Sequence, residues 1–117
     1  TDRGQGKAPD AAKPEVTGYL DRPEVKLEVS PLEVVAGRTT LTIRTVNFDV
    51  PAIDVQYSID GEPMPILYGW RLDENHTATV FVSSQTPKGR YRYLAIRDSR
   101  DRSPRGWIRV DVEVVVR

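Results

Sequence analysis

Residues 53–61 of this 117-residue chain read IDVQYSIDG, a stretch in which apolar and polar residues alternate up to a closing Asp-Gly pair. A period of two places the apolar side chains on one face of a β-strand and the polar ones on the other. Asp and Gly both tolerate positive φ, so Asp60-Gly61 is a strong signal for a tight hairpin turn. The stretch therefore predicts a strand that ends in a hairpin.

The same period recurs on both sides of this strand. Further strands are predicted within residues 24–30, 39–46, 66–72, 77–82, 90–96 and 108–116. Pro63 and Pro65 place the strand that follows them at a sheet edge, because proline cannot donate to a central ladder. Seven or eight strands, with turns at intervals of about ten residues, are typical of a β-sandwich. We therefore expect an all-β sandwich.

Composition fits a single small domain and excludes several kinds of site. Hydrophobic residues make up 38% of the chain and charged residues 29%, and seventeen basic residues balance seventeen acidic ones. The absence of Cys excludes a disulfide framework, a thiol nucleophile and thiolate metal ligands. No apolar run approaches the roughly 18 residues of a membrane helix, so no membrane span is expected. The charge is nonetheless polarised, with a net −5 over residues 1–87 and a net +5 over residues 88–117.

The N-terminal segment differs from the rest of the chain. Residues 1–23 contain three Pro and three Gly, and their sizeable apolar groups are Val16, Tyr19 and Leu20. Such a segment cannot bury enough surface to offset its own ordering entropy. We therefore divide the chain into an extended N-terminal arm, residues 1–23, and a sandwich domain, residues 24–117. The arm is expected to lie against a partner or to fold back on its own domain.

Several short motifs, taken in order, resemble a known family. Residues 30–37, 40–43 and 47–48 resemble the first two strands of bacterial immunoglobulin-like domains of the IPT/TIG kind, and residues 55–61 resemble their middle strand. The sequence PKGRY at residues 87–91 is similar to a tyrosine corner, in which the Tyr91 hydroxyl bonds to the backbone upstream. The chain departs from antibody-type domains in having no Cys pair and no Trp in the middle strand. The resemblance implies an immunoglobulin-like β-sandwich that serves as a spacer, adhesion or assembly module.

Residues capable of catalysis or of metal binding are few. His76 is the only histidine, and no G-x-S-x-G elbow is present, so a solvated turn residue is the preferred interpretation. Residues 73–75 and 98–101 carry oxygen ligands that calcium accepts. They lack EF-hand spacing, and the Arg residues beside the second group are expected to pair with its aspartates. We expect no enzyme activity, no cofactor and no metal. The sequon Asn75-His76-Thr77 has meaning only in a eukaryotic secretory pathway.

The strongest candidate for a binding site is the Arg-rich end of the chain. Arginine pairs with carboxylates and stacks on aromatic rings, which suits protein recognition, whereas the neutral net charge opposes nucleic-acid binding. The alternative is a solvated loop with internal Arg-Asp pairs. Strand alternation places Leu94 and Ile96 outward, although a bulge would swap their facing. The predicted partner-binding residues are Arg92, Leu94, Ile96, Arg100, Arg102, Arg105 and Trp107, with Val16, Tyr19 and Leu20 of the arm.

These features favour a non-enzymatic structural or assembly subunit. It would dock onto a protein partner, or onto further copies of itself, through its N-terminal arm and the outer face of its last strands. The complex or filament would lie at the bacterial surface or envelope, in an extracellular or periplasmic location. One alternative is a virion decoration or tail protein. Another is a carbohydrate-binding module that stacks sugar rings on Tyr68, Trp70 or Trp107.

Overall fold

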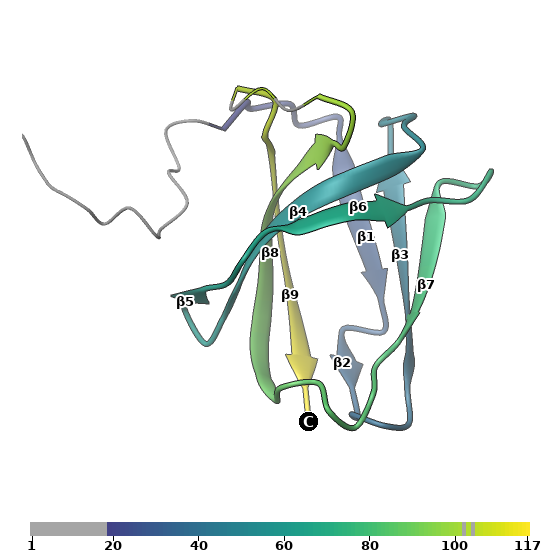
Figure 1. Cartoon of the computed structure of the whole chain (residues 1–117), viewed down its shortest axis with the longest axis vertical. Coiled ribbons are helices and arrows are strands. Elements are labelled where there is room, and N and C mark those ends of the chain that lie inside the picture. The colour runs from purple at the N-terminus through teal and green to yellow at the C-terminus, as the bar shows by residue number, and fades with distance from the viewer. Residues whose placement is uncertain (1–18, 102, 104) are drawn as a thin grey trace, which may run out of the picture.

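The computed structural model describes residues 19–101, 103 and 105–117, which form two β-sheets packed face to face (Figure 1). The first sheet has the order β1 (Lys26–Ser30), β3 (Thr40–Val46), β7 (Thr77–Phe81). The second has the order β2 (Glu33–Val34), β9 (Ile108–Val116), β8 (Gly89–Asp98), β4 (Ala52–Ile59), β5 (Glu62–Pro63), and β6 (Leu67–Arg71) also pairs with β4. The predicted all-β sandwich is confirmed. No helix that could cross a membrane occurs in the described part of the chain.

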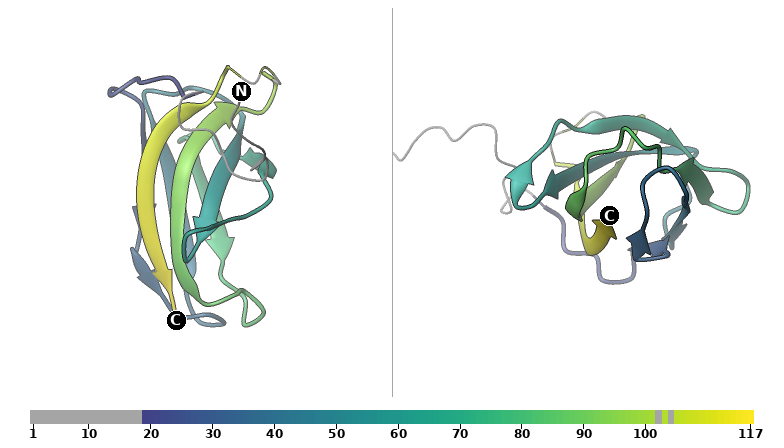
Figure 2. Two further views of the ribbon diagram at one scale, coloured as in Figure 1. Left: turned by 90° about the vertical axis from the view of Figure 1, so that its left-hand side faces the viewer. Right: turned by 90° about the horizontal axis from the view of Figure 1, so that it is seen from below.

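The strand connections link the two sheets at one side of the sandwich. Strand β1 pairs with β3 in the first sheet, whereas β2, three residues further on, pairs in parallel with β9 in the second. The chain therefore changes sheets between these two strands and closes that side of the sandwich. The strongly curved β8 and β9 lie side by side across the second sheet (Figure 2).

Two local motifs fold as the sequence predicts. Asp60 and Gly61 have φ of 51° and 82°, and Ile59 pairs with Glu62 directly across them. The hairpin turn is thereby confirmed. The Tyr91 hydroxyl donates to the Pro87 carbonyl at 2.6 Å, which is the bond of a tyrosine corner. This bond ties the start of β8 to the loop that crosses from the other sheet.

The core lies between the two sheets and is built mainly from β-branched residues. Ile43, Ile53, Val55 and Ile96 are fully buried. In β3 the alternation is regular, with Leu41 and Ile43 inward and their neighbours exposed. Strand β3 therefore follows the period of two that the sequence shows, whereas β4, which lies between β8 and β6, is buried on both faces from Ile53 to Gln56.

Strand β8 departs from that period at Leu94. Its register shifts between Tyr93 and Ala95 against β9, and between Gln56 and Tyr57 against β4, while Asp111 on β9 adopts a φ of 57°. A bulge inserts an extra residue and so reverses which face the later side chains occupy. Tyr93 and Ile96 therefore both face the core. The expectation that Ile96 faces outward is wrong.

The phenol of Tyr93 gives a pH-dependent prediction. Burial, with smaller contributions from Tyr91 and Tyr57, raises the pKa of Tyr93 to about 12. The folded state therefore holds this proton more tightly than the unfolded chain, whose tyrosines titrate near pH 10. We expect its contribution to stability to be complete below pH 10 and to be lost between pH 10 and pH 12, a change of at most about 3 kcal/mol. Urea unfolding across this range measures it, and Tyr93→Phe should flatten the profile. An equally steep decline in that variant would contradict the assignment.

Candidate functional site

The outer face of the second sheet carries a buried ion pair. Nη2 and Nε of Arg97 on β8 lie 2.7 and 3.2 Å from Oδ2 of Asp54 on β4. The Arg97 side chain is 7% exposed and that of Asp54 is fully buried. The other carboxylate oxygen of Asp54 accepts the Gly69 N–H at 3.0 Å. Both charges are therefore neutralised and bonded within the domain, which is what burial of charge requires.

The loop between β8 and β9 covers this ion pair. The indole of Trp107 lies 4.3 Å from the Arg97 guanidinium and is only 5% exposed. Arg97 also donates to the Ser103 carbonyl at 3.4 Å. The expectation that Trp107 presents an outward binding surface is wrong, because the loop folds its ring back onto the sheet. Trp107 cannot stack on a sugar in this position.

The described end of the predicted arm lies on the same face. The Leu20 N–H donates to the Trp107 carbonyl at 2.7 Å, and the Arg109 N–H donates to the Leu20 carbonyl at 3.1 Å. The Tyr19 hydroxyl donates to the Gln56 side chain, and the Arg109 guanidinium lies 5.5 Å from the Tyr19 ring. At residues 19 and 20 the chain thus folds back on its own domain. Val16 lies outside the described residues.

Three further Arg residues of the predicted site, Arg92, Arg100 and Arg105, are exposed. Arg92 binds Asp111 through two bonds of 2.7 and 3.0 Å, and its guanidinium holds the pKa of Asp111 below its ordinary value. Arg100 binds Asp98 at 2.9 Å, and this contact lowers the pKa of Asp98. Internal Arg-Asp pairing, the alternative considered for this loop, is therefore present in the structure. Arg105 is exposed, and Arg102 lies outside the described residues.

Two of the predicted residues, Arg92 and Leu94, line an open groove on the outer face of the second sheet, beside the β4–β5 hairpin. The groove has a volume of about 640 Å³. Its walls come from β4, β8, β9 and the β4–β5 hairpin, and its lining residues are Ser58, Asp60, Gly61, Pro63, Arg90, Arg92, Leu94 and Glu113. Arg90 pairs with Glu113 at 2.9 Å. The groove thus combines a partly exposed leucine with paired charges, and it presents no excess of positive charge.

A second opening lies between the edges of the two sheets. It has a volume of about 130 Å³, and its apolar walls include Trp70 of β6, Phe81 of β7 and Tyr93 of β8. Phe81 is 59% exposed and Tyr68 is 58% exposed, whereas Trp70 is partly buried, with its ring centroid 6.3 Å from that of Tyr93. Among the aromatic residues proposed for sugar stacking, Tyr68 alone offers a largely exposed ring.

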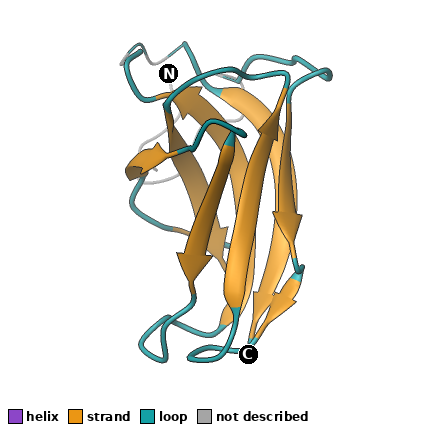
Figure 3. Ribbon diagram, turned by 90° about the vertical axis from the view of Figure 1, so that its right-hand side faces the viewer, coloured by secondary structure: helices purple, strands orange, loops and turns teal. Residues whose placement is uncertain are grey.

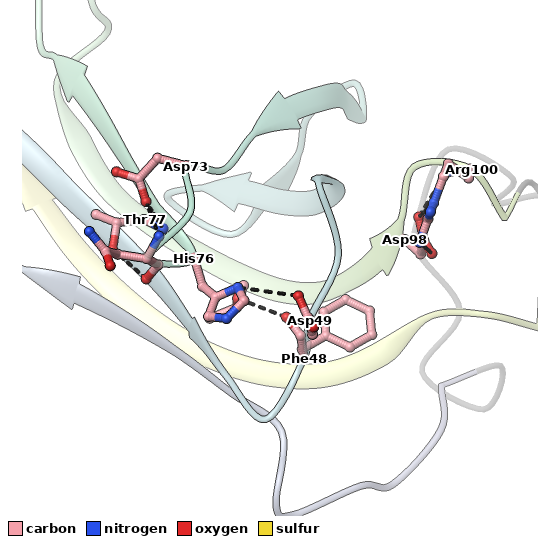
Figure 4. Close-up of polar contacts among 9 residues, drawn as sticks. Phe48, Asp49, Asp73, His76, Thr77, Asp98 and Arg100 are labelled. Atoms are coloured by element: carbon pink, nitrogen blue, oxygen red, sulfur yellow. Dashed lines mark hydrogen bonds and ion pairs between the residues drawn. The ribbon is translucent and has the colours of Figure 1, made fainter.

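Among the described residues of the polar turns, the acidic side chains and His76 are engaged in local contacts. His76 Nδ1 lies 3.6 Å from the exposed Asp49 carboxylate (Figure 4). One carboxylate oxygen of Asp73 accepts the Asn75 and Thr77 N–H groups, and Asp98 is held by Arg100. Within residues 19–101, 103 and 105–117, no three His, Cys, Asp or Glu residues cluster so that they could hold a metal ion.

Sequence reasoning missed the Asp54–Arg97 pair. Asp54 reads as the polar member of an alternating strand, which predicts a solvated carboxylate. The two residues are 43 positions apart, and the cover that buries them comes from a third region, the loop before β9. The available signal was the Trp at the end of an Arg-rich loop, because a large aromatic ring seldom stays solvated.

Comparisons with family models, with curated proteins and with solved structures find no match to this chain.

Proposed function

We propose that this protein is a non-enzymatic assembly subunit that docks onto a protein partner through the outer-face groove. The single observation that carries this function is the groove itself, in which Leu94 lies among charges that are already paired. A small apolar centre with a polar rim is the usual composition of a protein-binding patch. An assembly module, which is one of the roles that the family resemblance implies, would use such a patch, and we place it in a complex at the bacterial surface or envelope.

The paired charges favour a protein segment over a polyanion. Arg90 and Arg92 are neutralised by Glu113 and Asp111, and Asp60 adds a further negative charge to the wall. Nucleic-acid binding depends on unneutralised Lys and Arg that displace counterions from phosphates. An extended protein segment that offers one apolar side chain to Leu94, with polar residues on either side, matches the groove better than a nucleic acid does.

A displayed library of random peptides, selected on the immobilised full chain, tests this function. We expect enriched peptides to shift the amide resonances of Ser58, Arg92 and Glu113. Leu94→Asp should weaken their binding by at least about tenfold, which corresponds to about 1.4 kcal/mol. Arg92→Glu provides a second variant at an exposed position.

Leu32→Asp is the matched control, because Leu32 is 57% exposed and lies outside the groove. It should leave binding unchanged. The proposal fails if selection enriches no peptide, or if the enriched peptides bind the Leu94→Asp and Arg92→Glu variants as tightly as the original chain.

A further inference from the structure

The free edge of β7 is a surface separate from the groove. β7 ends the sheet order β1-β3-β7, and no described strand pairs with its other side. In Figure 1 it is the outermost strand at the right, and Figure 3 views the molecule from that side. The opening lined by Phe81 and Trp70 lies beside it. An apolar opening therefore lies directly beside an unpaired strand edge.

Hydrogen bonds to β3 fix which backbone groups of β7 face the edge. The His76 carbonyl accepts the Thr45 N–H, and the Val82 N–H donates to the Thr39 carbonyl, each at 3.0 Å. In an antiparallel ladder alternate residues bond to one neighbour, so the even-numbered residues of β7 face β3. The odd-numbered ones, Thr77, Thr79 and Phe81, face outward.

Thr79 and Phe81 supply the backbone groups available for pairing. Thr77 is already engaged, because its N–H donates to the Asp73 carboxylate at 3.0 Å and its carbonyl accepts the Asp73 N–H at 2.8 Å. The side chains of Thr79 and Phe81 are both exposed. The edge therefore offers a short ladder of two residues with exposed side chains on one face.

β7 lacks the devices that protect the other sheet edges. Its sequence, TATVF, contains no charge, no Pro and no Gly. By contrast, β1 carries Lys26 and Glu28, and β6 carries Arg71 and a Gly69 with a φ of 67°. Charged residues, glycine kinks and bulges are the usual means by which proteins prevent edge pairing. An uncharged, regular edge is therefore suited to pairing.

The strand is complementary to itself in the antiparallel direction. With a two-fold axis at Val80, Thr79 of one copy lies opposite Phe81 of the other, and each such pair exchanges both backbone bonds. The two Val80 side chains then meet on the face that lines the apolar opening. This register uses the two outward residues that are available for pairing, Thr79 and Phe81, and covers part of the Phe81 side chain, which is 59% exposed in the single chain.

The two ends of β7 carry charges of opposite sign, which favours antiparallel over parallel pairing of two copies. Asp73 and Glu74 lie in the turn before the strand. Arg38 and Lys88 lie beyond its other end, where the Gly37 N–H donates to the Val82 carbonyl at 2.6 Å. Antiparallel pairing brings the acidic end of one copy to the basic end of the other, whereas parallel pairing would place like charges together.

We propose that two copies of this chain associate by antiparallel pairing of β7 about Val80, which joins their three-stranded sheets into one six-stranded sheet. The inference does not depend on the groove. Light-scattering mass measurement of the full chain over a range of concentrations is the first test. We expect the mass to rise from 13.2 kDa towards twice that value as concentration increases.

Charge substitutions test the register. Thr79→Lys with Phe81→Lys places Lys opposite Lys in the proposed pair, and Thr79→Glu with Phe81→Glu places Glu opposite Glu. Each variant alone should be monomeric. A one-to-one mixture of the two should form a heterodimer. Because association is regained on mixing, the result cannot arise from misfolding of either variant.

Thr42→Lys is the matched control, because Thr42 is exposed on the neighbouring strand directly opposite Thr79. It adds a positive charge to the same face of the sheet, one strand away from the proposed interface, and should leave the dimer intact. A chain that stays monomeric at all concentrations overturns the proposal. So does a dimer that survives in both double variants, or a mixture that does not associate. Peptide binding by the groove is measured separately and is unaffected by any of these outcomes.

Discussion

Replacing Arg97 with Met is expected to destabilise the fold by about 3–5 kcal/mol, the usual effect of removing one member of a buried ion pair. The physical reason is the carboxylate of Asp54, which is fully buried and would lose its cation. Met fills much of the volume of the Arg stem, so lost packing contributes little. Urea unfolding at neutral pH, followed by tryptophan fluorescence, measures the change.

Arg100→Met is the control, because Arg100 pairs with Asp98 on the surface, with 65% of its side chain exposed. Exposed pairs contribute about 0–1 kcal/mol. Adding Asp54→Leu to Arg97→Met should restore much of the stability, since a buried pair can be replaced by apolar groups at little cost. Equal losses in Arg97→Met and Arg100→Met would mean that the Asp54–Arg97 pair is not buried in solution.

Ile96→Ala is expected to destabilise the domain by about 2–5 kcal/mol, whereas Leu94→Ala should have a much smaller effect. The two residues lie two positions apart on β8, so a regular strand would place both side chains on the same face of the sheet. The bulge separates them, because Ile96 is fully buried in the core while Leu94 is partly exposed in the groove. Removing methyl groups leaves a cavity at Ile96 but not at a surface position.

The same urea titration measures both variants, and the slope of the free energy against urea concentration shows whether two-state unfolding is retained. A large loss for Leu94→Ala with a small one for Ile96→Ala would place Leu94 in the core. The bulge as described would then be incorrect.

Much of the fold could be predicted because its signals are local. Alternation identifies strands such as β3 and β4 from their own residues, and the Asp60-Gly61 pair and the PKGRY motif each specify a turn over a few positions. Hydrophobic period and turn chemistry require no knowledge of distant partners. The edge position of β6 follows from the same signals. The prediction of seven or eight strands was too low, because the two-residue strands β2 and β5 carry no alternation of their own and bring the number in the described residues to nine.

The wrongly predicted parts of the candidate site, the facing of Ile96 and the exposure of Trp107, depend on contacts between residues that are far apart in the sequence. The bulge near Leu94 has no special residue of its own on β8, and its counterpart on β9 is Asp111, whose positive φ is unusual but tolerated for aspartate. The burial of Trp107 depends on where the nine-residue connection between β8 and β9 returns to the sheet. It depends also on Arg97, whose charge is neutralised by Asp54 of β4. The register shift between Tyr93 and Ala95 was enough to place Ile96 in the core instead of on the surface.

The parallel contacts along β9 have a mechanical consequence. Leu20 bridges Ile108 near the start of β9, and β2 pairs in parallel with its end. Tension applied between residues 20 and 117 pulls these segments and β9 in opposite directions along their common axis. The load is then shared in shear by all of these backbone bonds at once, instead of opening them one after another. The domain is thus built to resist stretching along its length.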